Sequence, residues 1–277
     1  MTEPTLYPEG GFLRLRIDLA YDGTNFYGWG KQPDRRSVQE EVEKAIGTIT
    51  QTKIESIVAG RTDAGVHATG QVIHVDVPES INLDEIAYKL NRILDEDIRI
   101  MQVSIAPEGF HARFSALRRS YTYKILDKNL PIPPIHRFGI ASWYRPLDVD
   151  LLNEASALVL GHHDFAAFCK LREGGTTIRT LEKFHWERQG DLLVATVVAD
   201  AFCYSMVRNL VGAAVCVADG RKEPAWMGEL LANKERVSDS LVFPARGLTL
   251  SFVEYPTNDQ LLERAKVTIG KRGNGPH

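Results

Sequence analysis

One carboxylate in this sequence stands where it could do chemistry. Asp63 lies in the run Gly-Arg-Thr-Asp-Ala-Gly-Val-His-Ala (residues 60–68), between two segments that we predict to be strands. A tight, glycine-flanked connection holds such a side chain at the end of a sheet, where it can act as a nucleophile or a general base. Arg61 could contact a phosphate or brace the loop. Asp-x-Gly also occurs in ordinary turns, but the length of this run favours an active site.

A second charged group, Arg208, is predicted to be buried. It lies in a mostly apolar helix (residues 202–212) and shares one helix face with Tyr204, Val211 and Val215. A buried guanidinium is costly unless an opposite charge pairs with it, and such groups gather at functional sites. We therefore expect Arg208 to be the partner that keeps the site carboxylate ionised. The alternatives are a structural ion pair elsewhere and a head group that reaches solvent.

A segment without acidic residues lies between Glu108 and Asp127, and basic side chains alternate there with aromatic ones. They are Arg113, Arg118, Arg119 and Lys124, with Phe110, Phe114, Tyr121 and Tyr123. Basic groups can meet phosphates while aromatic rings stack on bases, so the three arginines are candidate RNA contacts and Tyr121 a candidate for stacking. The alternative is a cationic edge strand whose aromatic face packs into the core, which is the role that we expect for Tyr123.

Composition limits the classes of function. The 277 residues are 44% hydrophobic and 25% charged, as in globular proteins with a well-buried core. No apolar stretch is long enough to span a bilayer and the first residues lack a signal-peptide core, so we expect a cytoplasmic protein without a membrane partner. The net charge is −3, so positive charge for a nucleic acid must be local.

We expect neither a metal ion nor a cofactor. Cys169, Cys203 and Cys216 form no Cys-x-x-Cys pair, which argues against zinc or a disulfide framework, and we place all three in the core. The adjacent His162 and His163 lack the spacing of metal ligands. The glycines at residues 28–31 do not have the spacing of a phosphate-binding loop.

Apolar periodicity predicts the elements that must position these residues. In the first half we expect strands at residues 12–20, 54–59, 71–77 and 98–105, and helices at residues 37–50 and 83–94. In the second half we expect strands at residues 119–126, 181–188, 192–199 and 248–255, and helices at residues 148–160, 201–218 and 225–231. A Ser-x-x-Glu capping box at Ser37 and an N-cap at Asp148 should start two of these helices.

The order of these elements is β-α-β-β-α-β in each half, which predicts an α+β protein of two ferredoxin-like halves. The boundary is expected near residues 107–116. We assign residues 1–11 to an N-terminal extension, residues 12–107 to the half with the Asp63 loop, residues 108–270 to the second half and residues 271–277 to a disordered tail.

Several runs together resemble the TruA family of tRNA pseudouridine synthases. They are Tyr-Asp-Gly-Thr at residues 21–24, Gly-Trp at 28–29, the Asp63 run, Phe-His-Ala-Arg-Phe at 110–114, residues 161–168, the Arg208 helix and Ala-Arg-Gly-Leu at 245–248. The resemblance extends almost from end to end. It departs at Gly30, where the family often has glutamine, at Ser120, where a basic residue is common, and near Asp95, where a proline is missing.

The resemblance implies a cofactor-independent isomerase that converts uridine to pseudouridine at positions 38, 39 and 40, in the anticodon stem-loop of tRNA. It makes Asp63 catalytic, Arg208 its charge partner and Tyr121 the residue that stacks on the base. It places His111 and Arg113 in an RNA-facing strip. It also implies a homodimer in which the halves of each chain form one mainly antiparallel sheet, with helices on one face and a central RNA-binding cleft.

Two other classes of function stay open. A non-catalytic RNA-binding module of ferredoxin-like fold would use the basic and aromatic segment, but it would leave Asp63 and the buried Arg208 without a purpose. A metal-dependent hydrolase acting on RNA would need several converging carboxylates or histidines, which we do not find in the sequence. The isomerase is therefore the favoured hypothesis.

Overall fold

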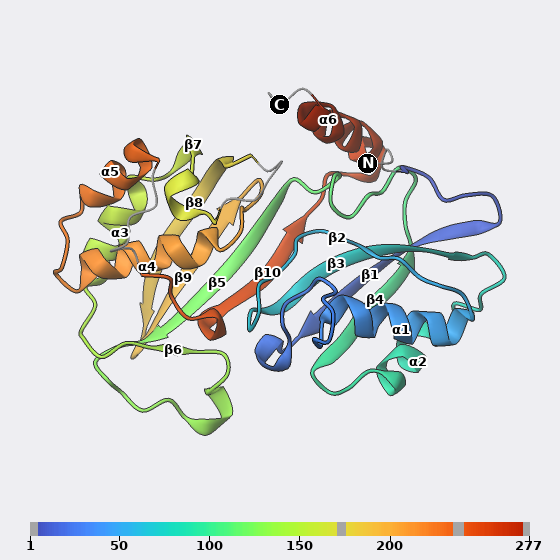
Figure 1. Ribbon diagram of the computed structural model, residues 1–277, viewed down its shortest axis with the longest axis horizontal. Helices are drawn as coiled ribbons and strands as arrows, with labels where there is room; N and C mark the ends of the chain where they lie inside the picture. Colours follow the sequence, from blue (N-terminus) through green and yellow to red (C-terminus); the bar gives the residue numbers. More distant parts are fainter. Residues whose placement is uncertain (1–4, 171–175, 235–240, 274–277) are drawn as a thin grey trace. The chain divides into compact units, whose positions relative to one another are not determined.

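The computed structural model describes residues 5–170, 176–234 and 241–273 of the chain, which forms two compact units (Figure 1). Unit 1 comprises Met1–Leu117 and Ser251–His277, and unit 2 comprises Arg118–Leu250. The division after Leu117 lies one residue beyond the predicted boundary region. The C-terminal segment returns to unit 1, whereas we had expected residues up to 270 to belong to the second half.

Unit 1 has the predicted element order. Its elements are β1 (Phe12–Tyr21), α1 (Val38–Thr50), β2 (Ile57–Val58), β3 (His67–Pro78), α2 (Ile86–Ile93), β4 (Ile98–Ile105) and, from the C-terminal segment, α6 (Leu261–Gly273). β1 pairs antiparallel with both β3 and β4, and the short β2 pairs antiparallel with β3. Leu15, Ile17 and Leu19 are fully buried, so the alternation in β1 does mark the face that packs on the core.

Unit 2 carries two short strands that the sequence did not predict, β6 and β7. The unit contains β5 (Arg118–Leu126), β6 (Ala141–Ser142), α3 (Val149–Ala157), β7 (Gly161–Asp164), β8 (Ile178–Gln189), β9 (Leu192–Ala199), α4 (Met206–Ala218) and α5 (Trp226–Asn233). β5 pairs antiparallel with β9, β9 with β8 and β8 with β7, while β6 runs parallel to β5. β10 (Leu248–Glu254) belongs to unit 2 up to Leu250 and to unit 1 from Ser251.

Short 3-10 helices complete the path of the chain. They are η1 (Gly23–Asn25), η2 (Pro134–His136), η3 (Ala166–Phe168), η4 (Ala245–Gly247) and η5 (Asn258–Gln260). With mostly antiparallel strands and helices in both units, the predicted α+β class is confirmed. The predicted tail overlaps the end of α6, and residues 274–277 lie outside the described residues. Among the helices of the described residues, none combines the length and the apolar character needed to cross a bilayer.

The predicted helix starts were right at Asp148 and wrong in detail at Ser37 and Ala201. Asp148 accepts hydrogen bonds from the backbone of Asp150 and Leu151 at the start of α3. Ser37 does precede α1, but within the described part of the chain its side chain makes no capping hydrogen bond. α4 begins at Met206 rather than at Ala201, because tertiary contacts hold the preceding residues in a loop.

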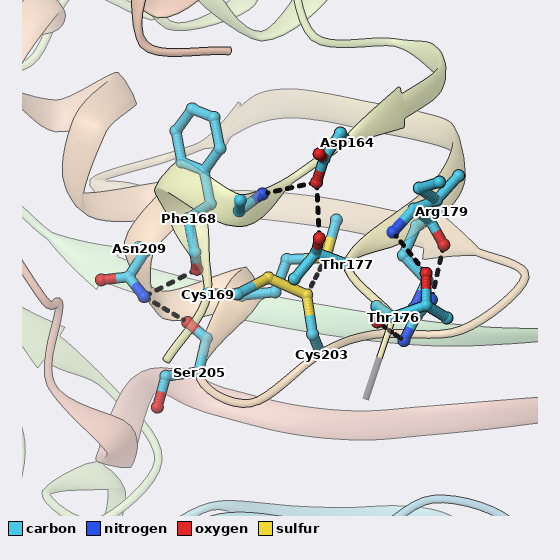
Figure 2. The surroundings of a disulfide bond; sticks show 12 residues. Asp164, Phe168, Cys169, Thr176, Thr177, Arg179, Cys203, Ser205 and Asn209 are labelled. Atoms are coloured by element: carbon cyan, nitrogen blue, oxygen red, sulfur yellow. Dashed lines mark hydrogen bonds between the residues drawn. A yellow bond between two sulfur atoms is a disulfide. The ribbon is translucent and has the colours of Figure 1, made fainter. Parts of the chain in front are cut away.

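One of those contacts is a disulfide bond between Cys169 and Cys203, whose Cα atoms lie 5.8 Å apart (Figure 2). The expectation of three free core thiols was therefore wrong for this pair and holds for Cys216, which is free and buried. The bond joins the chain after η3 to the loop before α4. Asn209 strengthens this junction by donating to Phe168 O (2.8 Å) and Ser205 O (3.1 Å) (Figure 2).

Candidate active site

Asp63 lies on a turn between β2 and β3, where its side chain is partly exposed. The turn closes when Val66 N donates to Asp63 O (3.1 Å). Gly65 has φ +75°, a left-handed conformation that glycine adopts without strain. Arg61, two residues before Asp63, is exposed. Unit 1 therefore places Asp63 on a connection between two strands, as we predicted.

The segment after β1 packs directly against this turn. Trp29 N donates to Thr62 O (3.0 Å), and Gly65 N donates to Phe26 O (3.2 Å). A side chain at Gly28 has no space, since its Cβ would lie 2.7 Å from Thr62 O. Gly23 is equally constrained against the backbone of Val66. The motifs at residues 21–24 and 28–29 are thus packing partners of the Asp63 run.

A buried hydrogen-bond network supports the turn from the other side. The Tyr21 hydroxyl lies 2.7 Å from Thr62 Oγ1. Gln71 Nε2 donates to the same hydroxyl (3.2 Å) and to Gly60 O (2.8 Å). Burial raises the pKa of Tyr21 to about 12, so the phenol stays protonated at neutral pH. With Gln71 donating to the phenolic oxygen, the Tyr21 proton is available to Thr62. Sequence reasoning missed this network, because each member alone resembles an ordinary core residue.

His67 has a structural role. Gly23 N donates to His67 Nδ1 (3.0 Å), which ties the start of β3 to the turn after β1. The same nitrogen lies 3.1 Å from Asp22 Oδ1. Burial alone would raise the pKa of Asp22, but hydrogen bonds from the side chain and backbone of Thr24 lower it.

Arg36 anchors the C-terminal end of the segment that follows β1, residues 22–36. Its guanidinium donates to Glu41 (2.6 Å), Asp97 (2.5 Å) and Asp95 (3.0 Å), and it lies 4.2 Å from the centre of the Phe26 ring. These three carboxylates are, within the described ranges, the one group of acidic, histidine or cysteine side chains that is close enough to hold a metal ion. The guanidinium pairs with all three, and Asp97 is the main cause of the raised pKa of Arg36.

Tyr121 and Arg208 belong to unit 2. The centre of the Tyr121 ring lies 5.1 Å from that of Phe202, and the two rings meet edge to face. Phe202 is on the loop before α4. Every residue of α4, all of which the structure describes, is buried except the partly exposed Arg208. Arg208 Nε donates to Phe243 O (2.8 Å), and Phe243 N donates back to Arg208 O (3.1 Å). The pairing of Arg208 with Asp63 stays a prediction.

The structure gives the candidate RNA contacts different surroundings. Arg113 is exposed, and Arg118 is paired with Glu182 at 3.3 Å. Arg119 is buried and donates to Asp200 O (2.7 Å), so it braces the loop before α4 instead of projecting into solvent. Tyr123 is buried as expected, with its hydroxyl donating to Pro244 O (2.5 Å).

His111 is not placed to face RNA, which corrects our expectation. It is only 3% exposed, and its Nδ1 accepts hydrogen bonds from the backbone of Arg113 (3.3 Å) and Phe114 (3.1 Å). The ring also packs at 4.7 Å against His74, whose Nδ1 accepts from Ala112 N (3.0 Å). Both histidines thus shape the turn at residues 110–114 from inside unit 1.

A family model and the curated relatives agree on one family. A family model described as tRNA pseudouridine synthase matches residues 19–115 and 155–256. This chain belongs to that family. Among its curated relatives, tRNA pseudouridine synthase A of Streptomyces griseus is 51% identical, over 93% of each chain. The Mycobacterium leprae protein of the same name is 43% identical, over 99% of this chain and 100% of its own.

Membership confirms the resemblance seen in the sequence, and it makes this chain an isomerase, as all pseudouridine synthases are. The two ranges matched to the pseudouridine synthase model contain Asp63 and Arg208, whereas Tyr121 lies between them. Among solved structures, a Cbf5-Nop10-Gar1 complex is similar over 73% of this chain and 54% of the matched chain, with a TM-score of 0.31 and 12% identity. A likeness at that level carries no argument.

Proposed function

We propose that this enzyme isomerises uridine to pseudouridine at positions 38, 39 and 40 of the tRNA anticodon stem-loop, with Asp63 as the catalytic carboxylate. The observation that carries the proposal is the Asp63 turn itself. It presents a partly exposed carboxylate on a backbone that two sets of contacts hold, Trp29 with Thr62 and Tyr21 with Thr62. A carboxylate held in this way is preorganised for attack or for proton removal.

The reaction defines what the site must supply. The N1–C1′ bond breaks, the uracil rotates, a C5–C1′ bond forms, and the hydrogen of C5 leaves as a proton while N1 gains one. Atoms and electrons balance without an oxidant or a metal ion. Asp63 supplies the negative charge that these reaction steps need, either as a nucleophile or as a base that removes a sugar proton.

The other candidates take supporting roles in this proposal. Arg208 pairs with Asp63 and keeps it ionised, and Tyr121 stacks on the uracil. Arg61, Arg113 and Arg118 contact tRNA phosphates. A homodimer acting in the cytoplasm completes the proposal, and sedimentation of the purified protein would test the dimer.

The test is tritium release from tRNA labelled at uridine C5, since C5 loses its hydrogen only when it becomes the glycosidic carbon. The native protein should release tritium, and Asp63→Asn, which keeps the shape but cannot attack or accept a proton, should not. Replacing uridines 38, 39 and 40 by cytidine in turn should remove release site by site. Near-normal release by Asp63→Asn would reject the catalytic role.

Two further outcomes separate the alternative classes. Tight tRNA binding without release from any tRNA would point to the RNA-binding module. Strand cleavage that stops in excess chelator, without tritium release, would point to the metal-dependent hydrolase.

A further inference from the structure

We propose that Tyr27 and Arg35 form an RNA-contact surface beside the Asp63 turn. In this proposal the Tyr27 ring stacks on an unpaired base and the Arg35 guanidinium binds a phosphate of the same tRNA. The inference rests on the proposed function, because it concerns how the tRNA that Asp63 acts on is held.

The two side chains already form a unit on the surface. The Arg35 guanidinium lies 4.6 Å from the centre of the Tyr27 ring, and the ring is 50% exposed. Gln32 and Arg35 form an antiparallel bridge, and Gln32 Nε2 donates to Tyr27 O (2.9 Å). An exposed cation–π contact stabilises a fold by only about 0.5–1 kcal/mol. The fold therefore gains little from keeping this pair at the surface.

The backbone around Tyr27 is fixed against the turn that carries Asp63. The residue before it, Phe26, is buried and accepts a hydrogen bond from Gly65 N (3.2 Å). The residue after it, Gly28, has no space for a side chain against Thr62. Tyr27 N itself donates to Arg36 O (3.0 Å), and Arg36 is the anchored residue described above. These contacts hold the backbone of Tyr27 at a fixed position next to the Asp63 turn. RNA binding therefore costs little conformational entropy in this segment.

The chemistry of the pair fits a single-stranded stretch of RNA. Aromatic rings stack on bases whatever their sequence, and each such contact is a large part of single-strand affinity. A guanidinium that lies over a ring still donates in its own plane, so Arg35 can bind a phosphate without leaving Tyr27. Two neighbouring cations are paired within unit 1, Lys31 with Glu43 and Arg36 with three carboxylates.

Unit 1 offers a matched control pair. On α2 the Arg92 guanidinium lies 5.9 Å from the centre of the Tyr88 ring, and Tyr88 is 59% exposed. The chemistry and exposure resemble those of the Tyr27 and Arg35 pair. Tyr88, however, lies on a helix whose backbone is separate from the segment at residues 22–36 that packs on Asp63.

The experiment measures steady-state tritium release and tRNA binding by Tyr27→Ala, Arg35→Ala, Tyr88→Ala and Arg92→Ala. The first two should raise KM and Kd by about fivefold or more while kcat stays within about twofold. Tyr27→Phe should recover most of the affinity that Tyr27→Ala loses. Arg35→Ala should also lower the slope of log Kd against log salt by about one. The two α2 variants should match the native protein.

Equal effects of the two pairs on KM, or a fall in kcat with KM intact, would overturn the contact surface. Circular dichroism of each variant identifies a loss of folding, and in that case Tyr27→Phe and Arg35→Lys decide the matter through KM. Asp63→Asn, assayed alongside, keeps the two proposals apart. If it is inactive but binds tRNA normally, a negative result at Tyr27 concerns this inference alone. If it is active, the proposed catalytic role fails whatever Tyr27 shows.

Discussion

The hydroxyl of Tyr21 lies 2.7 Å from Oγ1 of Thr62, the residue that directly precedes Asp63. Tyr21 ends β1 and is paired in register with Ala68 at the start of β3. The Asp63 turn is therefore connected to the central strands of unit 1 through a buried side-chain contact, and Gln71 adds hydrogen bonds to Tyr21 and to Gly60 O. A displacement of the turn by a fraction of an ångström would misdirect Asp63.

Tyr21→Phe should lower kcat by about tenfold and leave KM for tRNA unchanged, because the lost hydroxyl is buried and bonds to Thr62 and Gln71 inside unit 1. Thr62→Val should have the same effect. If the two residues act through one hydrogen bond, the double variant will be no slower than the slower single variant. Tritium release at saturating tRNA measures this. Thr62→Ser keeps the hydroxyl and should lose less, and additive losses would argue against a shared bond.

Arg208→Ala should lower activity by about 100-fold or more, since it removes the charge partner that we propose for Asp63. It should also lower the free energy of unfolding by about 1–3 kcal/mol, because Phe243 O loses its donor. Arg208→Lys restores charge without the fixed guanidinium geometry and should recover activity in part. Tritium release and urea unfolding report the two effects separately. A fully active Arg208→Ala would reject the pairing.

Lowering the pH should begin to destabilise unit 1 at pH values well above those at which carboxylates titrate. Burial, with the charge of Arg14 nearby, lowers the pKa of His111 to about 4 and lowers that of His74 well below its usual value. Because the unfolded chain takes up these protons first, stability is complete above about pH 6.5 and falls as pH drops toward the folded pKa values. Each histidine contributes a slope of at most about 1.4 kcal/mol per pH unit.

Urea unfolding at pH 7, 6 and 5 measures this loss. His111→Gln should flatten the dependence on pH. Equal stability of the native protein at pH 7 and pH 5 would contradict the assignment.

Reduction should destabilise unit 2. Cys169 and Cys203 are 34 positions apart in the sequence, so opening the bond between them removes a loop constraint from the unfolded chain. The expected loss is about 2–4 kcal/mol. Dithiothreitol should therefore lower the melting temperature of the native protein and leave a Cys169→Ser/Cys203→Ser variant unaffected. Unfolded without reductant, the native protein should show the single thiol of Cys216. Three reactive thiols under the same conditions would refute the bond.

Local patterns in the sequence were enough to predict most of the fold. The alternation of Leu15, Ile17 and Leu19 identified the buried face of β1, because alternate side chains of a strand point to the same face of the sheet. The helix predicted at residues 37–50 and the cap at Asp148 were equally local. Asp63 could be placed on its connection because strand-like segments lie on both sides of it.

What the sequence did not reveal depends on residues far apart in the chain. The start of α4 was predicted five residues too early, because the helix pattern continues through residues that Cys169 and Tyr121 hold in a loop. His111 was assigned to RNA from a motif, whereas its burial depends on His74 in β3. The contact between Tyr21 and Thr62 spans 41 positions and has no periodic signal.

The last strand and the segment after it affect the order in which the protein can fold during its synthesis. Tyr255 donates to Ala112 O (2.7 Å), Leu117 N donates to Glu254 O (2.8 Å), and Ser115 Oγ donates to Leu261 O (3.2 Å). Unit 2 is continuous in sequence and can fold as the chain emerges from the ribosome. Unit 1 must wait for residues 251–261, so the half that carries the Asp63 turn begins first and is completed last.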